Sequence, residues 1–219
     1  MQPPSSHALS PWLLGAAGSA LVTLLATLLG GALTPGYSHL SMYISELGAR
    51  GAPLEWPLRL AGFLPAGLLM LAFCVAAWRA LPHRWPVAVS LLGLVLYALG
   101  YLIAVVFPCD LGCRPAEPSL SQVIHNAGGL LGYLLAPLIL LLMARQARAW
   151  REARHLVWSG HAAAALALCG LLTLAPESPL VGLSQRAIEA AILLWFTLLG
   201  LYLRRVPNAV SERTEAAQE

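Results

Sequence analysis

Six long apolar runs limit what this chain can fold into. They cover residues 11–34, 57–78, 86–107, 123–143, 157–175 and 187–203. A helix of about 20 apolar residues crosses a bilayer core of about 30 Å and satisfies its backbone hydrogen bonds internally. The sequence therefore predicts an all-α fold, a polytopic integral membrane bundle of six transmembrane helices.

These runs form one predicted domain. We expect a single six-helix transmembrane domain over residues 11–205, a cytoplasmic N-terminal segment over 1–10, and a disordered cytoplasmic tail over 206–219. With 58% hydrophobic and 11% charged residues, the composition excludes an ordinary soluble protein. The first run is longer than a signal-peptide core and no Lys or Arg precedes it, so we expect it to be retained as a helix.

The basic residues, all 13 of them arginine, predict the orientation. The loops after the second and fourth runs and the C-terminal tail hold nine: Arg79, Arg84, Arg145, Arg148, Arg151, Arg154, Arg204, Arg205 and Arg213. The other loops, with the adjoining helix starts, hold four: Arg50, Arg59, Arg114 and Arg186. Because arginine-rich short loops stay in the cytoplasm, we expect both termini there.

This orientation predicts a multi-pass protein of the bacterial plasma (inner) membrane whose loops 35–56, 108–122 and 176–186 face outward. The arginine clusters adjoin apolar runs, as topology determinants do, so we expect no nucleic-acid partner. Membrane lipids are the expected partners, and protein partners stay open.

The first outward loop, "YSHLSMYISELGARGAP", has helical periodicity. Leu40, Tyr43, Ile44 and Leu47 recur at i, i+3, i+4 and i+7, and Gly48 supplies a stop. We expect a short helix in the outer interface. Either it is an amphipathic anchor, or its polar side chains, His39, Ser45 and Glu46 among them, face the bundle.

Two further runs begin with polar side chains. In the fourth run, Gln122, His125, Asn126 and Gly129 share one helical face, and Gly128 with Gly132 favours close helix packing. In the sixth, Gln185, Arg186 and Glu189 lie on adjacent turns. Arg186 at i, i+3 from Glu189 indicates an ion pair, although an arginine at this depth can also hold an anionic head group.

The segment "FPCDLGC" places Cys109 and Cys113 four residues apart in an outward loop. In an oxidising compartment, this spacing favours a small disulfide. A metal claw that includes Asp110 and His125, or two free thiols, are the alternatives.

No Ser-x-x-Lys, Gly-x-Ser-x-Gly, His-Glu-x-x-His or P-loop signature is present, so whether the chain is an enzyme stays open. We expect no cofactor. The alternative is zinc held by His125, Asp110 and Glu46, a ligand set with an open position.

The outward polar residues suggest one site that binds or modifies a lipid or other amphiphile. In an enzymatic version His125 is the general base, Asp110 or Glu46 orients it, and Ser45 completes the catalytic set. The binding residues are then Arg186, Gln185, Asn126 and His39. The alternatives are a non-catalytic membrane assembly or structural subunit, and a small-molecule transporter.

Several short motifs occur in a fixed order: "SELG" at residues 45–48, "VFPCD" at 106–110, His125, and "GLSQR" followed by Trp195. In this order the chain resembles an uncharacterised bacterial and archaeal six-helix membrane family, domain of unknown function 998, from about residue 12 to 205. The resemblance implies fold and location, and no activity. A more distant similarity to eukaryotic membrane proteins of lipid-anchor remodelling and stress response implies lipid handling at the outer leaflet.

Overall fold

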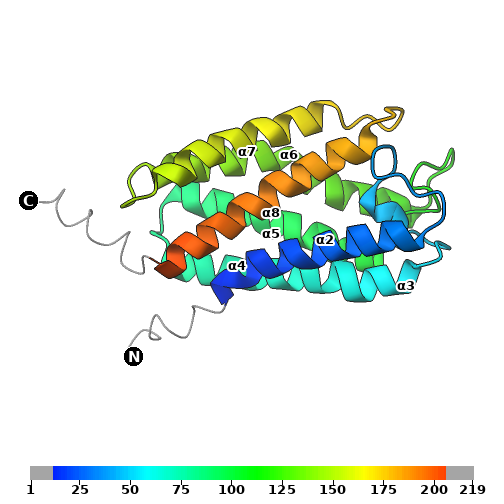
Figure 1. Cartoon of the computed structure of the whole chain (residues 1–219), viewed down its shortest axis with the longest axis horizontal. Helices are drawn as coiled ribbons and strands as arrows, with labels where there is room; N and C mark the ends of the chain where they lie inside the picture. The colour runs from blue at the N-terminus through cyan, green and yellow to red at the C-terminus, as the bar shows by residue number, and fades with distance from the viewer. Residues whose placement is uncertain (1–11, 206–219) are drawn as a thin grey trace, which may run out of the picture.

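The computed structural model describes residues 12–205, and these residues form six long helices that run side by side (Figure 1). The predicted segments 1–10 and 206–219 lie outside the described residues. In chain order the elements are η1 (Trp12–Leu14), α2 (Gly15–Leu33), η2 (Ile44–Gly48), α3 (Glu55–Pro57), η3 (Leu58–Phe63), α4 (Leu64–Ala80), α5 (Trp85–Val106), α6 (Leu120–Ala147), α7 (Arg154–Leu172) and α8 (Val181–Arg205).

Six helical stretches are long and apolar enough to cross a membrane, which confirms the predicted all-α multi-pass fold. They are Trp12–Leu33, Glu55–Ala80, Trp85–Val106, Leu120–Ala147, Arg154–Leu172 and Val181–Arg205. Residues 12–205 contain no strand. The last helix begins six residues before the apolar run at 187–203, because the polar residues at its start are themselves helical and find partners inside the bundle.

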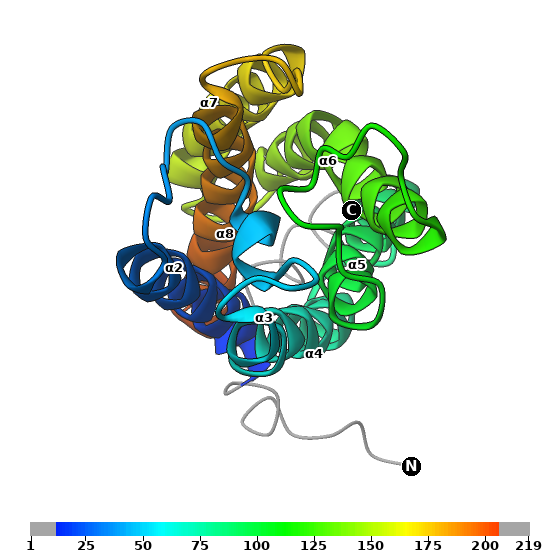
Figure 2. The same ribbon diagram turned by 90° about the vertical axis from the view of Figure 1, so that its right-hand side faces the viewer.

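The helices form a ring, seen end-on in Figure 2. Each long helix packs against the next one in the chain, and α8 closes the ring against α2, whereas α6 and α8 scarcely touch. Small residues allow the close approaches: a Cβ on Gly128 would lie 2.7 Å from Ile103, and one on Gly132 would lie 2.9 Å from the Cα of Tyr97. The Gly128 and Gly132 pair therefore serves the packing of α6 on α5.

The end of the bundle where residues 12 and 205 lie is filled by an apolar core. Phe73 of α4 and Phe196 of α8 meet edge to face with ring centroids 6.0 Å apart. The neighbouring Trp195 is buried, and its Nε1 donates to the Leu156 carbonyl at 3.1 Å. Gly160 of α7 makes room for this indole, because a Cβ there would lie 2.8 Å from the indole Nε1.

The opposite end, which we call the distal end, carries the loops at residues 34–54, 107–119 and 173–180 (Figure 1). Here the predicted short helix is present as the 3-10 helix η2, but it packs inside the protein and not on its outer surface. Ile44, Glu46, Leu47 and Gly48 are buried, and η2 sits between the helix ends near the middle of the ring (Figure 2). Its apolar side chains fill space inside the bundle, which is why the anchor interpretation fails.

The predicted disulfide between Cys109 and Cys113 is confirmed, with the two Cα atoms 5.0 Å apart. Gly112 and Cys113 have positive φ angles of 77° and 53°, which fold this segment back on itself. The Arg50 amide donates to the Cys109 carbonyl at 2.8 Å, so the disulfide loop is also joined to the loop after η2.

Candidate functional site

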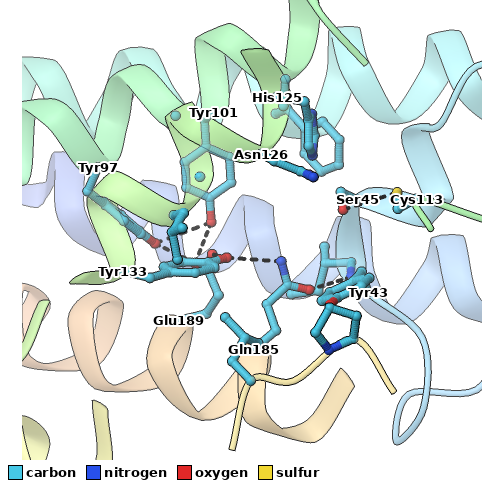
Figure 3. Close-up of a pocket in the computed structure, with 18 of the residues that line it drawn as sticks. Tyr43, Ser45, Tyr97, Tyr101, Cys113, His125, Asn126, Tyr133, Gln185 and Glu189 are labelled. Carbon is cyan, nitrogen blue, oxygen red and sulfur yellow. Dashed lines mark hydrogen bonds between the residues drawn. The ribbon is translucent and has the colours of Figure 1, made fainter. Parts of the chain in front are cut away.

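A cavity of about 360 Å³ lies at the distal end of the bundle (Figure 3). Helices α5, α6 and α8 supply most of its wall, and η2 and the disulfide loop close it from the distal side. It occupies the space left because α6 and α8 are separated within the ring.

Glu189 of α8 forms the floor of this cavity and is 7% exposed. Three tyrosine hydroxyls donate to its carboxylate: Tyr101 to Oε2 at 2.7 Å, Tyr133 to Oε1 at 2.6 Å, and Tyr97 also to Oε2 (Figure 3). Tyr97 and Tyr101 are one turn apart on α5, so both reach the same oxygen, while Tyr133 approaches from α6. A buried carboxylate is thus solvated by hydroxyls from two neighbouring helices.

The hydrogen bonds continue from this floor to the distal loops. Gln185, one turn before Glu189 on α8, donates from Nε2 to the Tyr133 hydroxyl at 3.0 Å and accepts from the Ile44 amide at 2.7 Å. On the other side, the Thr23 and Tyr101 hydroxyls lie 3.2 Å apart. The network therefore joins α2, α5, α6, α8 and η2 around one carboxylate.

His125 and Asn126 of α6 lie on the opposite wall of the cavity (Figure 3). The Phe107 carbonyl lies 3.1 Å from Nδ1 of His125, and because a carbonyl only accepts, Nδ1 carries the proton. In the neutral ring Nε2 is then the acceptor. Asn126 accepts from Gln122 Nε2 at 2.8 Å, and Ser45 donates to the Cys113 sulfur at 3.5 Å.

Asp110 accepts hydrogen bonds from the residue that caps the start of α6. Its two carboxylate oxygens accept from the amide and the hydroxyl of Ser119, at 2.9 and 2.7 Å. Ser119 is the N-cap residue of α6 and accepts from the Gln122 amide at 3.2 Å. The backbone and side-chain hydrogen bonds from Ser119 lower the pKa of Asp110, because they favour the charged carboxylate.

Glu46 is buried behind the cavity wall. Its Oε1 accepts from the Tyr43 amide at 2.9 Å, and Arg114 lies 3.6 Å away. Burial raises the pKa of Glu46, and the Tyr43 amide and the Arg114 charge oppose this effect. The carboxylate holds η2 in place and does not line the cavity.

Arg186 holds the loop at residues 34–43 against the start of α8. Its guanidinium donates to the Met42 carbonyl at 3.0 Å, to the Tyr37 hydroxyl at 2.5 Å and to Nδ1 of His39 at 3.2 Å. No ion pair joins Arg186 to Glu189, so the predicted i, i+3 pair is wrong. The two side chains leave α8 on different faces, and each finds neutral partners there.

The environment of this arginine also affects its neighbours. Burial lowers the pKa of His39, and the Arg186 charge acts in the same direction. Burial raises the pKa of Tyr37, although the Arg186 charge opposes it. His39 therefore favours its neutral form, with Nδ1 accepting from the guanidinium.

The structure thus divides the residues proposed from the sequence into two sets. Ser45, His125, Asn126 and Gln185 line one cavity. Glu46, Asp110, Arg186 and His39 lie outside its lining, where they hold η2, the start of α6 and the first loop. Within residues 12–205, no three His, Cys, Asp or Glu side chains gather as a metal site requires, so His125, Asp110 and Glu46 do not surround a common point.

Sequence reasoning missed the floor of the cavity. Glu189 was assigned to an ion pair, and Tyr97, Tyr101 and Tyr133 were not considered. The available signal was a glutamate near the start of the sixth apolar run, since ionisable residues within a membrane span often mark functional sites. Tyr97 and Tyr101 at i, i+4 were the second signal, because one helical face then presents two hydroxyls.

The fold and the cavity define a six-helix membrane protein with a polar cavity at one end of its bundle. Residues 16–202 match the family described as protein of unknown function (DUF998), and the chain belongs to that family. No curated protein and no solved structure is significantly similar to the chain.

Proposed function

We propose that the chain binds an amphiphile, such as a membrane lipid, in the distal cavity. The observation that carries this proposal is that one cavity has both apolar and polar lining. Phe63, Ala104, Leu130 and Leu174 supply apolar surface, and the Glu189 network supplies a polar floor. A pocket that combines extensive apolar surface with a few convergent polar groups suits a ligand with both characters.

The position of the cavity mouth supports the same proposal. The exposed residues of the lining include Asn126 and Leu130 on α6 and Pro176 in the segment after α7. The mouth therefore extends along the side of the bundle, where an acyl chain in the bilayer has access. A Cβ on Gly129, between these two α6 residues, would meet no atom within 4 Å.

Gly129 offers a direct test. Gly129→Leu places a side chain in the open space of the cavity, while Ala127→Leu places the same side chain on an exposed α6 residue outside the lining. The full chain, in a non-ionic detergent, is mixed with lysophospholipids of one acyl chain length and examined by native mass spectrometry. We expect at least one lysophospholipid to stay bound to the wild type and to Ala127→Leu, with about tenfold less bound to Gly129→Leu. Equal retention by all three proteins would overturn the proposal.

We further propose that the distal end faces outward from a bacterial inner membrane. The excess of arginine on the other loops supports this orientation. The Cys109–Cys113 disulfide supports it too, since disulfides persist in oxidising compartments. Reporter fusions at the C-terminus are expected to show a cytoplasmic location, and a periplasmic signal from them would contradict the assignment.

A second candidate, modification of the bound amphiphile, is favoured by His125. This ring lines the cavity, and its Nδ1–H is held by the Phe107 carbonyl, so Nε2 is the basic atom of the neutral ring. Phe107 thus takes the orienting role that the sequence assigned to Asp110 or Glu46. Release of fatty acid or head group from a phospholipid, lost in His125→Gln, would support catalysis. Binding without any product would leave the chain a binding protein.

A further inference from the structure

The geometry points to a primary amine as the deepest part of the bound amphiphile, with its ammonium group against the Glu189 carboxylate at the cavity floor. This inference rests on the proposed function, since it names the chemical class of the head group that the same cavity would bind.

The first observation is a buried carboxyl group that has no ion-pair partner. Glu189 is buried, yet none of the ion pairs within residues 12–205 includes it. Arg186, three residues earlier, is engaged by the first loop, and Arg114 is engaged by Glu46 and the Pro176 carbonyl. Charges at this depth are costly and are usually paired. The cavity therefore presents a carboxyl group without an ion-pair partner, and a cationic ligand beside it would stabilise its charged form.

The second observation is a free acceptor position. A carboxylate has about four acceptor positions, and the three tyrosine hydroxyls use three of them. Oε1 accepts only from Tyr133, while Oε2 accepts from both Tyr97 and Tyr101. An ammonium group can donate to Oε1 in a charge-assisted hydrogen bond and can turn its other N–H groups toward phenolic oxygens.

The same surroundings suit an organic ammonium better than a metal ion. The floor holds one carboxylate, and phenol rings form the rest of it, whereas Ca²⁺ takes six to eight oxygens and Zn²⁺ prefers Cys and His. Aromatic faces attract an ammonium by cation–π interaction. A quaternary ammonium has no N–H to donate, so a primary amine makes fuller use of Oε1.

The rim of the cavity carries a positive charge, which is complementary to the phosphate of a phospholipid head group. Arg114 lines the mouth with its side chain 38% exposed. An aminophosphate head group, in which a phosphate lies between the amine and the acyl chain, matches a carboxylate at the floor and an arginine at the rim. We therefore infer recognition of a lipid of the phosphoethanolamine class.

The test compares four ligands of one acyl chain on the full protein by native mass spectrometry: lysophosphatidylethanolamine, its N-acetyl derivative, lysophosphatidylcholine and lysophosphatidylglycerol. We expect the ethanolamine lipid to bind at least about tenfold more tightly than the other three, the effect of one charge-assisted hydrogen bond. In Glu189→Gln, which keeps the size of the side chain, this preference is expected to fall to about twofold or less. The matched control is Glu117→Gln, an exposed glutamate outside the cavity lining.

Two results overturn the inference and leave the proposed function standing. One is that all four lipids bind with equal affinity and that Gly129→Leu weakens the binding of each. The other is an ethanolamine preference that persists in Glu189→Gln. If no lipid shows Gly129→Leu-sensitive binding, the proposed function fails and the inference fails with it. The comparison of lysophosphatidylethanolamine with its N-acetyl derivative uses the wild-type protein. It therefore tests whether the free amine is required even if a variant does not fold.

A soluble amine without an acyl chain carries the same ammonium group as the lipid. Phosphoethanolamine without an acyl chain is added in about a hundredfold excess over the lysolipid, where a ligand of equal affinity would displace nearly all of it. We expect no displacement of the lysolipid, because the chain supplies most of the apolar contact. Full displacement would show that the site recognises a soluble amine, and it would overturn the assignment to a lipid.

Discussion

Arg186 and Glu189 lie three residues apart on α8 and are a base and an acid, yet they have different surroundings: Arg186 is partly exposed, and Glu189 is buried. Arg186 binds a loop through the Met42 carbonyl, Tyr37 and His39. Glu189 binds side chains of α5 and α6 at the floor of a cavity. Spacing of i, i+3 along a helix permits an ion pair but does not produce one where each side chain has hydrogen-bond partners on its own face.

The two side chains therefore differ in what their loss would change. Every partner of Arg186 belongs to the first loop or to the start of α8, so its contacts position chain segments. The partners of Glu189 leave one side of the carboxylate toward empty space. Arg186 only holds chain segments together, whereas Glu189 both joins helices and faces the cavity.

The largest expected effect is that of Glu189→Ala. It leaves Tyr97, Tyr101 and Tyr133 without their acceptor, and each unsatisfied buried hydroxyl costs about 1–3 kcal/mol. We expect the free energy of unfolding in mixed micelles to fall by about 3–5 kcal/mol. Glu189→Gln retains an acceptor oxygen and should lose less than half of that. A change within about 0.5 kcal/mol for Glu189→Ala would show that the network contributes little to stability.

The next effect is that of Arg186→Met, which keeps the length of the side chain and removes its donors. Hydrogen bonds to a charged group contribute about 1.5–3 kcal/mol, so we expect a loss in that range. Hydrogen exchange should accelerate in residues 34–43 and stay unchanged in α5, and lysolipid binding should persist. Arg154→Met, at an exposed arginine at the opposite end of the bundle, is the control. Faster exchange around Tyr97 would mean that the two charged sites are coupled after all.

The smallest effect concerns Glu46, whose pKa is raised by burial. Because the pKa of Glu46 is higher in the folded protein than in the unfolded one, binding of a proton stabilises the folded state. This stabilisation is fully present below the pKa of the unfolded state, and it is lost as the pH rises through the pKa of the folded state. We expect Glu46→Gln to be more stable relative to wild type at pH 7 than at pH 4, by less than about 1 kcal/mol. Thermal unfolding of both proteins at the two pH values measures the difference. An advantage that grows toward pH 4 would contradict the raised pKa.

The sequence predicted the number and placement of the helices well, because apolar length is a local property. The disulfide was also predicted, since its two cysteines are four residues apart on one loop. Four of the proposed site residues, Ser45, His125, Asn126 and Gln185, do line one cavity. The site assignments themselves stay predictions until ligand binding is measured.

The remaining site residues could not be placed from the chain because their partners are distant in sequence. Glu189 meets hydroxyls from residues 97, 101 and 133, and although Tyr97 and Tyr101 share a helical face, no local pattern connects them with Tyr133 or Glu189. The sequence suggested other partners for both charges: His125 for Asp110, and Glu189 or an anionic head group for Arg186. Asp110 in fact binds the N-cap Ser119, and Arg186 binds a loop about 145 residues earlier.

The amino-acid sequence was enough to predict a six-helix membrane protein, because a bilayer imposes a length and a polarity that can be read along the chain, and a disulfide between two cysteines four residues apart. The tertiary structure decided which polar groups share a space. Separation of α6 from α8 within the ring opens the cavity, and the direction in which each side chain leaves its helix decides that Glu189 enters it while Arg186 does not. Helix packing and side-chain direction depend on contacts between distant segments, and no single stretch of the chain contains them.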